Sequence, residues 1–319
     1  MNKKNILYQV LFTMLAVYLI FLMLRYPALA LEYASTGLHL WFTKMIPALL
    51  PFMILSGIMI RMNLTETFVH LLHPVLHRIF GTSPNDSYTM IMGFLCGFPM
   101  GARIVGELYE KEMISGGEGS SLLYFCNNIG PIYFLSYVVP MLAIDKPLIP
   151  FLIMYGIPVF YGFLLMRIVP LFHLSRRHDT AVSGNIEFKS PQPPQRESFL
   201  AAVDSSVVSG LIGIARLGGY MVFFNLLNIL FVPFHKADQN LLNVYRCLLE
   251  ITSGIDYSGR SIYYGVLILL PFGGFSCIAQ TYSMIRQTSL SIRHYVFHKI
   301  IQTALTALCY GLLYSCNAG

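Results

Sequence analysis

The strongest constraint on this chain is a set of long runs that contain no charged residue. Eight stretches of 16 to 26 residues lack Asp, Glu, Lys and Arg: 6–24, 45–60, 87–102, 119–144, 147–166, 217–234, 261–285 and 300–319. A helix needs about 20 mostly apolar residues to cross a bilayer. Only 11% of the chain is charged, against about 25% in ordinary soluble domains. The runs therefore predict an all-α polytopic protein embedded in a lipid bilayer.

The remaining composition argues against several other classes. The net charge of +6 comes from cations at the ends of apolar runs, not from a basic stripe, so we expect no nucleic-acid partner. The six cysteines form no C-x-x-C pair. His294 and His298 lack the Glu of an H-E-x-x-H motif, and no G-x-S-x-G turn occurs. We expect no metal site, no cofactor and no enzymatic activity.

The region from Ser87 to Pro131 carries unusual interruptions. Gly93, Gly97, Pro99 and Gly101 interrupt the first uncharged run, which Arg103 closes, and the next run contains Cys126-Asn127-Asn128 and Gly130-Pro131. Irregular backbone survives at membrane depth only where protein buries it or where it lines a cavity. One interpretation is a polar site inside the membrane; the other is two kinked helices whose Gly and Pro serve packing.

A similar pattern occurs in the second half of the chain. Residues 97–103 (GFPMGAR) placed over 274–280 (GFSCIAQ) share three of seven residues at an offset of 177. With 87–102 and 261–285 as re-entrant hairpins, about six spanning helices remain, and the two halves become inverted repeats. In that architecture secondary transporters bind substrate between the repeats.

Charge distribution suggests an orientation. Lys3 and Lys4 precede the first helix, and the polar segment 173–198 carries four cations, so both are placed in the cytoplasm. This divides the chain into an N-terminal helix and connector (1–37), a first half (38–172), a linker (173–198) and a second half (199–319). The arrangement conflicts with the positive-inside tendency at five cations that it places outside: Lys236, Arg246, Arg260, Arg286 and Arg293.

Four motifs resemble a known family. These are Gly-Phe-Pro-x-Gly-Ala-Arg at 97–103, Asn-Asn-x-Gly-Pro at 127–131, Glu-x-Thr-x-Gly at 250–254 and Gly-Gly-x-Ser-x-x-Ala-Gln at 273–280. Together they resemble the YlbJ-like sporulation integral membrane proteins of the nucleoside-recognition Gate domain family. The resemblance covers roughly 40–310. It departs from the family pattern at Arg103, where lysine is common, and at Ile278, where a polar residue is frequent.

The resemblance implies a fold related to concentrative nucleoside transporters. It also implies an endospore-forming bacterium and transport of dipicolinic acid from mother cell to forespore, through the outer forespore membrane. Dipicolinate is a planar dicarboxylate, and a guanidinium such as that of Arg103 can hold a carboxylate through two parallel hydrogen bonds. The alternative for Arg103 is a side chain that extends to the headgroups.

Candidate substrate-binding residues follow from these motifs. Twelve residues are expected at the site: Gly97, Pro99, Gly101, Arg103, Asn127, Asn128, Gly130, Glu250, Thr252, Gly274, Ser276 and Gln280. The glycines and the proline would shape backbone. Asn127, Asn128, Ser276 and Gln280 would hydrogen-bond the substrate, and Glu250 is either a coupling-ion or proton site or a helix cap.

Two other functions stay open. The chain is either a transporter of another solute, such as a nucleoside or a metal ion, or a non-transporting scaffold for spore envelope assembly. The sequence is compatible with a homo-oligomer.

Overall fold

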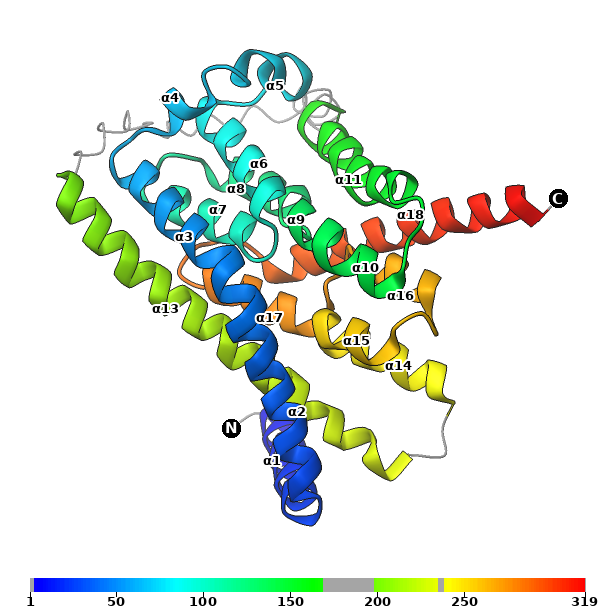
Figure 1. Ribbon diagram of the computed structural model, residues 1–319. Coiled ribbons are helices and arrows are strands. Elements are labelled where there is room, and N and C mark those ends of the chain that lie inside the picture. The colour runs from blue at the N-terminus through cyan, green and yellow to red at the C-terminus, as the bar shows by residue number, and fades with distance from the viewer. Residues whose placement is uncertain (1–2, 169–197, 235–237, 319) are drawn as a thin grey trace.

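The computed structural model describes residues 3–168, 198–234 and 238–318, and every regular element in these ranges is helical (Figure 1). Within them, seven segments are long and apolar enough to cross a membrane: Ile6–Arg25, Pro27–Arg61, Gly116–Leu142, Leu148–Ile168, Phe199–Pro233, Tyr263–Ile285 and Ile292–Ser315. The all-α polytopic class is thus confirmed. The sequence predicts about six spans, and the additional one is the run expected to be a re-entrant hairpin at 261–285. The predicted linker 173–198 lies outside the described residues except for Ser198.

The chain contains two sets of elements in the same order: a long helix, a hairpin, an interrupted helix and a further helix. The first set consists of α2 (Pro27–Leu40), the π-helical turn η1 (Trp41–Met45) and α3 (Ile46–Arg61); the hairpin α6 (Pro84–Cys96) and α7 (Met100–Glu110); α8 (Gly116–Cys126), α9 (Pro131–Tyr133), η2 (Phe134–Val138) and α10 (Val139–Leu142); and α11 (Leu148–Phe163) with η3 (Leu164–Ile168). The second set consists of α13 (Phe199–Leu226) with η5 (Leu227–Phe234); the hairpin α14 (Gln239–Leu249) and α15 (Ile251–Ser258); α16 (Tyr263–Leu269) and α17 (Gly274–Ile285); and α18 (Ile292–Ala318).

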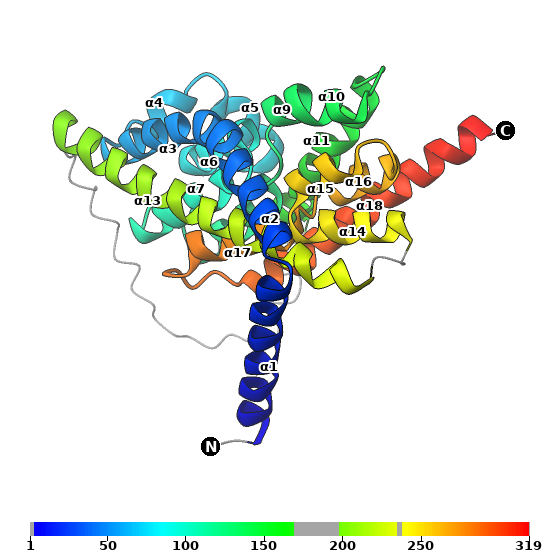
Figure 2. The ribbon, with the colours of Figure 1, turned by 60° about the horizontal axis from the view of Figure 1, so that its bottom comes forward.

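Three elements lie outside these sets. The short helices α4 (Thr65–Val69) and α5 (His73–Phe80) connect α3 to α6. Helix α1 (Lys3–Arg25) precedes both sets, touches α2 and η5, and projects from the body that the other helices form (Figure 2).

Local sequence determines where the first hairpin begins and turns. Ser83 and Asp86 form a capping box at the start of α6: the Ser83 hydroxyl accepts from the Asp86 N–H, and the Asp86 carboxylate accepts from the Ser83 N–H. The helix ends where Gly97 adopts a φ of 86°, a conformation that favours glycine. After Phe98 and Pro99, α7 returns along α6.

The hairpin of the second set is formed by other residues than the sequence predicts. Helices α14 and α15 pack along each other, and Glu250 both ends α14 and caps α15. In contrast, α16 and α17 touch only sparsely, because they follow each other end to end with a break at 270–273. The segment 261–285 is therefore an interrupted helix that corresponds by order to α8–α10, not to the hairpin at 84–110. The alignment of 97–103 with 274–280 pairs elements of different kinds.

In both sets the hairpin tip crosses the break of the interrupted helix. A Cβ at Gly97 would collide with the backbone of Gly130, and one at Gly274 would lie 3.0 Å from the Cys247 carbonyl oxygen. Because the two backbones approach so closely, only glycine fits at the contact position of each crossing. The crossings bring the two breaks and the two hairpin tips to the middle of the molecule.

The long helices of the two sets pack against each other. Helix α13 lies along α2 and α3, and the Trp41 indole N–H donates to the Ile214 carbonyl oxygen at 2.8 Å. Trp41 belongs to η1, where one residue is added to the helical turn. This turn, next to the hairpin tips, also contains Lys44.

Candidate functional site

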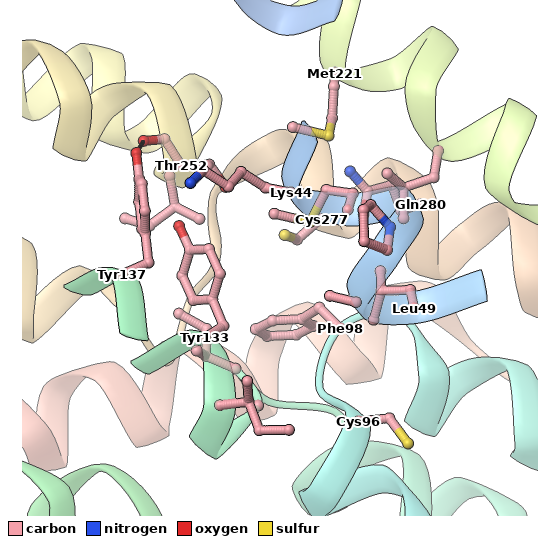
Figure 3. A pocket seen from close by; sticks show the side chains of 18 of the residues that line it. Lys44, Leu49, Cys96, Phe98, Tyr133, Tyr137, Met221, Thr252, Cys277 and Gln280 are labelled. Carbon is pink, nitrogen blue, oxygen red and sulfur yellow. Dashed lines mark hydrogen bonds between the residues drawn. The ribbon is translucent and has the colours of Figure 1, made fainter. Parts of the chain in front are cut away.

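A cavity of about 350 Å³ lies where the hairpin tips and helix breaks meet (Figure 3). It is walled by η1 and α3, by the tip of the first hairpin, by the break before α9, by α13, by the α14–α15 junction and by α17. Its lining includes Lys44, Leu49, Cys96, Phe98, Gly130, Tyr133, Tyr137, Met221, Glu250, Thr252, Cys277 and Gln280. Residues of both sets line the cavity, as expected for a substrate site between two repeats.

Four of the predicted residues line this cavity: Gly130, Glu250, Thr252 and Gln280. Ser276 supports one of them, because its hydroxyl accepts from the Gln280 Nε2 at 3.0 Å. Gly97 and Gly274 shape the two crossings next to it, Pro99 precedes α7, and Gly101 packs against the Cys126 carbonyl. The structure thus gathers most of the predicted set around one space.

Glu250 has the geometry of a helix cap. Its carboxylate accepts from the Thr252 N–H at 3.2 Å and from the Ser253 N–H at 2.8 Å, and the residue is 2% exposed. Burial raises the pKa of the Glu250 carboxyl above its ordinary value, although both backbone N–H groups act in the opposite direction. The acidic group on the cavity wall therefore resists ionisation.

Lys44 is a cation on the cavity wall that the sequence analysis missed. Figure 3 shows its ammonium on the same side of the cavity as Tyr133 and Thr252. The Lys44 side chain is exposed, and within the described ranges no carboxylate forms an ion pair with it. The sequence does not distinguish this lysine from one at the end of a membrane span, because it directly precedes the uncharged run 45–60.

Tyr133 provides a second polar group at the cavity. Its hydroxyl is buried and makes no hydrogen bond of good geometry in the described part of the chain, although it approaches the Thr252 side chain. Tyr137, one helical turn on, instead donates to the Thr252 carbonyl oxygen at 3.0 Å and lies 2.9 Å from Asp256 Oδ1. A buried hydroxyl left unpaired is costly, so a ligand group in the cavity is its natural partner.

Arg103 lies outside this cavity. Its Nε donates to Glu107 Oε1 at 2.8 Å and its Nη2 donates to the Ser209 hydroxyl at 3.1 Å. It lines a separate polar cleft of about 180 Å³, together with Arg216 and Arg286. The guanidinium is therefore already engaged by protein groups, and none of the residues that line its cleft lines the cavity.

Asn127 and Asn128 are fully buried and hold elements together instead of facing the cavity. The Asn127 Oδ1 accepts from the Ala102 N–H at 3.3 Å, and its Nδ2 donates to the Thr281 hydroxyl at 2.9 Å and to the Tyr295 hydroxyl at 3.0 Å. These bonds join the first hairpin to α17 and α18. The Asn128 Oδ1 accepts from Lys299, a buried residue that the sequence analysis did not single out.

Comparisons with known proteins agree with the motifs. Residues 42–143 match the Gate family model, described as nucleoside recognition. The chain is 22% identical over 335 residues to the sporulation integral membrane protein YlbJ of Bacillus subtilis (strain 168), covering 91% of this chain and 79% of YlbJ. No solved structure matches. The resemblance to YlbJ-like members of the Gate family is confirmed, and the matched region contains the cavity residues that the first set supplies.

Proposed function

We propose that this YlbJ-like Gate protein is a membrane transporter of a small organic anion and that the central cavity binds the substrate. The leading substrate is dipicolinate, moved from mother cell to forespore through the outer forespore membrane. The observation that carries the proposal is the cation of Lys44 on the wall of a cavity shared by both sets of elements. The cavity volume of about 350 Å³ falls in the range of small-molecule sites.

The chemistry of the wall favours an anion. Lys44 offers an ammonium without an ion-pair partner in the described residues, and Tyr133 offers a hydroxyl whose nearest polar neighbour is the Thr252 side chain. Glu250 would oppose an anion only when ionised, and burial raises its pKa. Phe98 and Tyr133 add aromatic surface against which a planar ring can pack.

The order of elements supports alternating access. If Tyr263–Ile285 crosses the bilayer, each set has three spanning elements, and an odd number makes the second set inverted with respect to the first. The two hairpins then enter from opposite sides. Substrate between them could be exposed to one side and then to the other.

A seven-span topology also reduces the conflict in the charge distribution. Arg167, in the last turn before the linker, donates to the carbonyl oxygens of Arg78 and Ile79, so the end of η3 lies on the side from which the first hairpin enters. The Tyr109 and Ser289 hydroxyls lie 2.7 Å apart, which supports a position of the loop after α17 on the same side. Arg286 and Arg293 thus join the linker in the cytoplasm, as the positive-inside tendency favours.

The biological setting comes from the relative. YlbJ is named as a sporulation protein, and the four motifs that this chain shares with YlbJ-like proteins imply dipicolinate as cargo. Placement in the outer forespore membrane, with a cytoplasmic N-terminus, belongs to the same proposal.

The test is dipicolinate binding to purified protein and its uptake into proteoliposomes. A charge-assisted hydrogen bond contributes about 1.5–3 kcal/mol, so Lys44→Met should weaken binding by roughly 10- to 100-fold. Lys146→Met, the same substitution at an exposed position outside the cavity, should bind like wild type. Citrate serves as a second anion.

Three results would contradict parts of the proposal. A folded wild type that neither binds nor transports dipicolinate removes this substrate. Unchanged binding by Lys44→Met removes the cavity as the site. If Arg103→Gln abolishes binding while Lys44→Met does not, the site is the polar cleft of Arg103, as the sequence analysis expected.

A nucleoside is the second candidate substrate, because the matched family is described as nucleoside recognition. An uncharged nucleoside would use the hydroxyls and amides of the cavity and would depend little on Lys44. Uridine and adenosine in the same assays decide between the two: binding that survives Lys44→Met would favour the nucleoside.

A further inference from the structure

Lys299 is a fully buried lysine in the centre of the protein, with 0% of its surface exposed. Its Nζ donates to the Asn128 Oδ1 at 2.6 Å and to the Gln302 Oε1 at 3.4 Å. Two aromatic rings complete the surroundings, with the Nζ 5.2 Å from the ring centre of Phe98 and 5.7 Å from that of Tyr295. Neutral oxygens and ring faces thus hold this ammonium.

Among the described residues no carboxylate forms an ion pair with Lys299. The titratable side chains that face it are Cys126 on α8, Cys277 on α17 and Tyr295 on its own helix. A charge buried without an opposite charge is expensive, above all in a membrane. A purely structural role would be served as well by an apolar side chain of similar size.

The position of Lys299 suggests what offsets that cost. Phe98, over which the ammonium lies, is at the tip of the first hairpin and lines the central cavity, as does Cys277. Asn128 lies in the break of the interrupted helix. The cation therefore sits directly behind the cavity wall, between hairpin tip and helix break, where its field acts on any anion in the cavity.

We propose that the Lys299 ammonium is a built-in counter-cation of the substrate cavity, held where side-chain oxygens would otherwise bind a metal cation. Amide oxygens such as those of Asn128 and Gln302 are ligands that hard metal cations use. With the ammonium in this place, the cavity attracts an anion without a metal ion bound there. This inference rests on the proposed anion transport and adds the source of its charge selectivity and its independence of sodium.

The experiment measures dipicolinate affinity of the full chain in detergent, in sodium buffer and in choline buffer. Wild type should bind equally in both. Lys299→Met, which keeps the length of the side chain and removes its charge, should bind about tenfold more weakly or worse. Thr306→Val is the matched control: it removes a buried hydrogen bond of the same helix, from the Thr306 hydroxyl to the Gln302 carbonyl oxygen at 2.9 Å, but no charge and no group that holds the Lys299 ammonium.

A chemical rescue separates charge from packing. Lys299→Ala removes the part of the side chain that propylammonium can replace, so added propylammonium should restore at least half of the lost affinity. Propanol has a similar shape without a charge and should restore none.

Several outcomes would overturn the inference. They are sodium-dependent binding by wild type, binding by folded Lys299→Met within twofold of wild type, and equal rescue by propanol and propylammonium. If the Lys299 variants do not fold, the comparison of sodium with choline in wild type still decides. A wild type that binds no anion overturns the proposed function and this inference together, whereas normal wild-type binding with unaffected Lys299→Met overturns this inference alone.

Discussion

The central cavity and the amide cluster behind it (Asn127, Asn128, Lys299 and Gln302) are both polar regions at helix breaks, but their polar groups are used differently. In the amide cluster each side chain bonds to another element: Asn127 reaches α7, α17 and α18, and Lys299 reaches the break after α8. In the cavity, Lys44 and Tyr133 have no such partners among the described residues. Polar groups whose bonds are satisfied internally stabilise the fold, whereas unsatisfied groups on a cavity wall are available to a ligand.

The same difference separates two cations that sequence alone cannot distinguish. Arg103 is held by Glu107 and Ser209, while Lys44 faces the cavity without a carboxylate partner in the described residues. Support for substrate contact therefore comes from the place of a cation on the cavity wall, as for the exposed Lys44, and not from its place in a motif, as for Arg103.

The largest effect should come from the amide cluster and should concern stability. Asn127→Ala removes three hydrogen bonds and leaves the Ala102 N–H and two hydroxyls buried without this partner. We expect the free energy of unfolding to fall by about 2–3 kcal/mol, measured by thermal unfolding in detergent. Asn240→Ala, at an exposed position, should change it by less than about 0.5 kcal/mol. Dipicolinate affinity of the folded fraction should stay within about twofold of wild type; a specific loss of affinity with full stability would place Asn127 in the site instead.

At the cavity wall we expect a smaller effect, which concerns dipicolinate affinity and not stability. Tyr133→Phe removes a hydroxyl that has no partner among the described residues, so the unfolding free energy should stay the same or rise slightly. Dipicolinate affinity should fall about 3- to 10-fold, the effect of one neutral hydrogen bond. Tyr155→Phe reverses the pattern, since its hydroxyl donates to the Ile129 carbonyl oxygen at 2.9 Å: stability falls and affinity changes little. Equal losses of affinity in both variants would contradict the distinction between the two regions.

The smallest effect should be a pH dependence that comes from Glu250. Because burial raises the pKa of this carboxyl in the folded protein, the folded state holds the proton more tightly than the unfolded chain does. Its contribution to stability is therefore greatest at low pH and is lost as pH rises through the raised pKa. The same ionisation places a negative charge on the cavity wall, so dipicolinate affinity should also fall by a few-fold as pH rises through the raised pKa of Glu250.

Glu250→Gln tests this pH dependence. The variant keeps one cap acceptor for the N–H groups of Thr252 and Ser253 and should show a flatter affinity profile than wild type. Calorimetric titrations at each pH provide the comparison. Identical profiles for wild type and variant would show that Glu250 acts as a cap alone.

Much of the architecture could be predicted because it depends on local chemistry. Gly97, Gly130 and Gly274 mark positions where backbone approaches backbone, and their identity alone placed the breaks. The second hairpin could not be found in this way. It contains Arg246 and Glu250 and therefore does not lie within an uncharged run. The sequence analysis assigned the second hairpin to the uncharged run 261–285 instead.

Among the site residues, Glu250, Thr252, Gly130 and Gln280 were found because they lie within motifs at the breaks and line the cavity. Lys44 and Lys299 were missed because a lysine next to an apolar run has the same appearance whether it reaches the headgroups, lines a cavity as Lys44 does, or is buried as Lys299 is. The roles of these residues in substrate binding remain predictions.

The sequence by itself determined the membrane environment, the helical class and the places where helices are interrupted. These depend on the solvation of the backbone and side chains in hydrocarbon and on the conformations open to Gly and Pro, which are local properties. Only the tertiary structure decided which hairpin crosses which break, and which polar groups meet each other before they can meet a ligand. Those outcomes depend on contacts between residues far apart in the chain, such as Asn128 with Lys299 and Trp41 with Ile214.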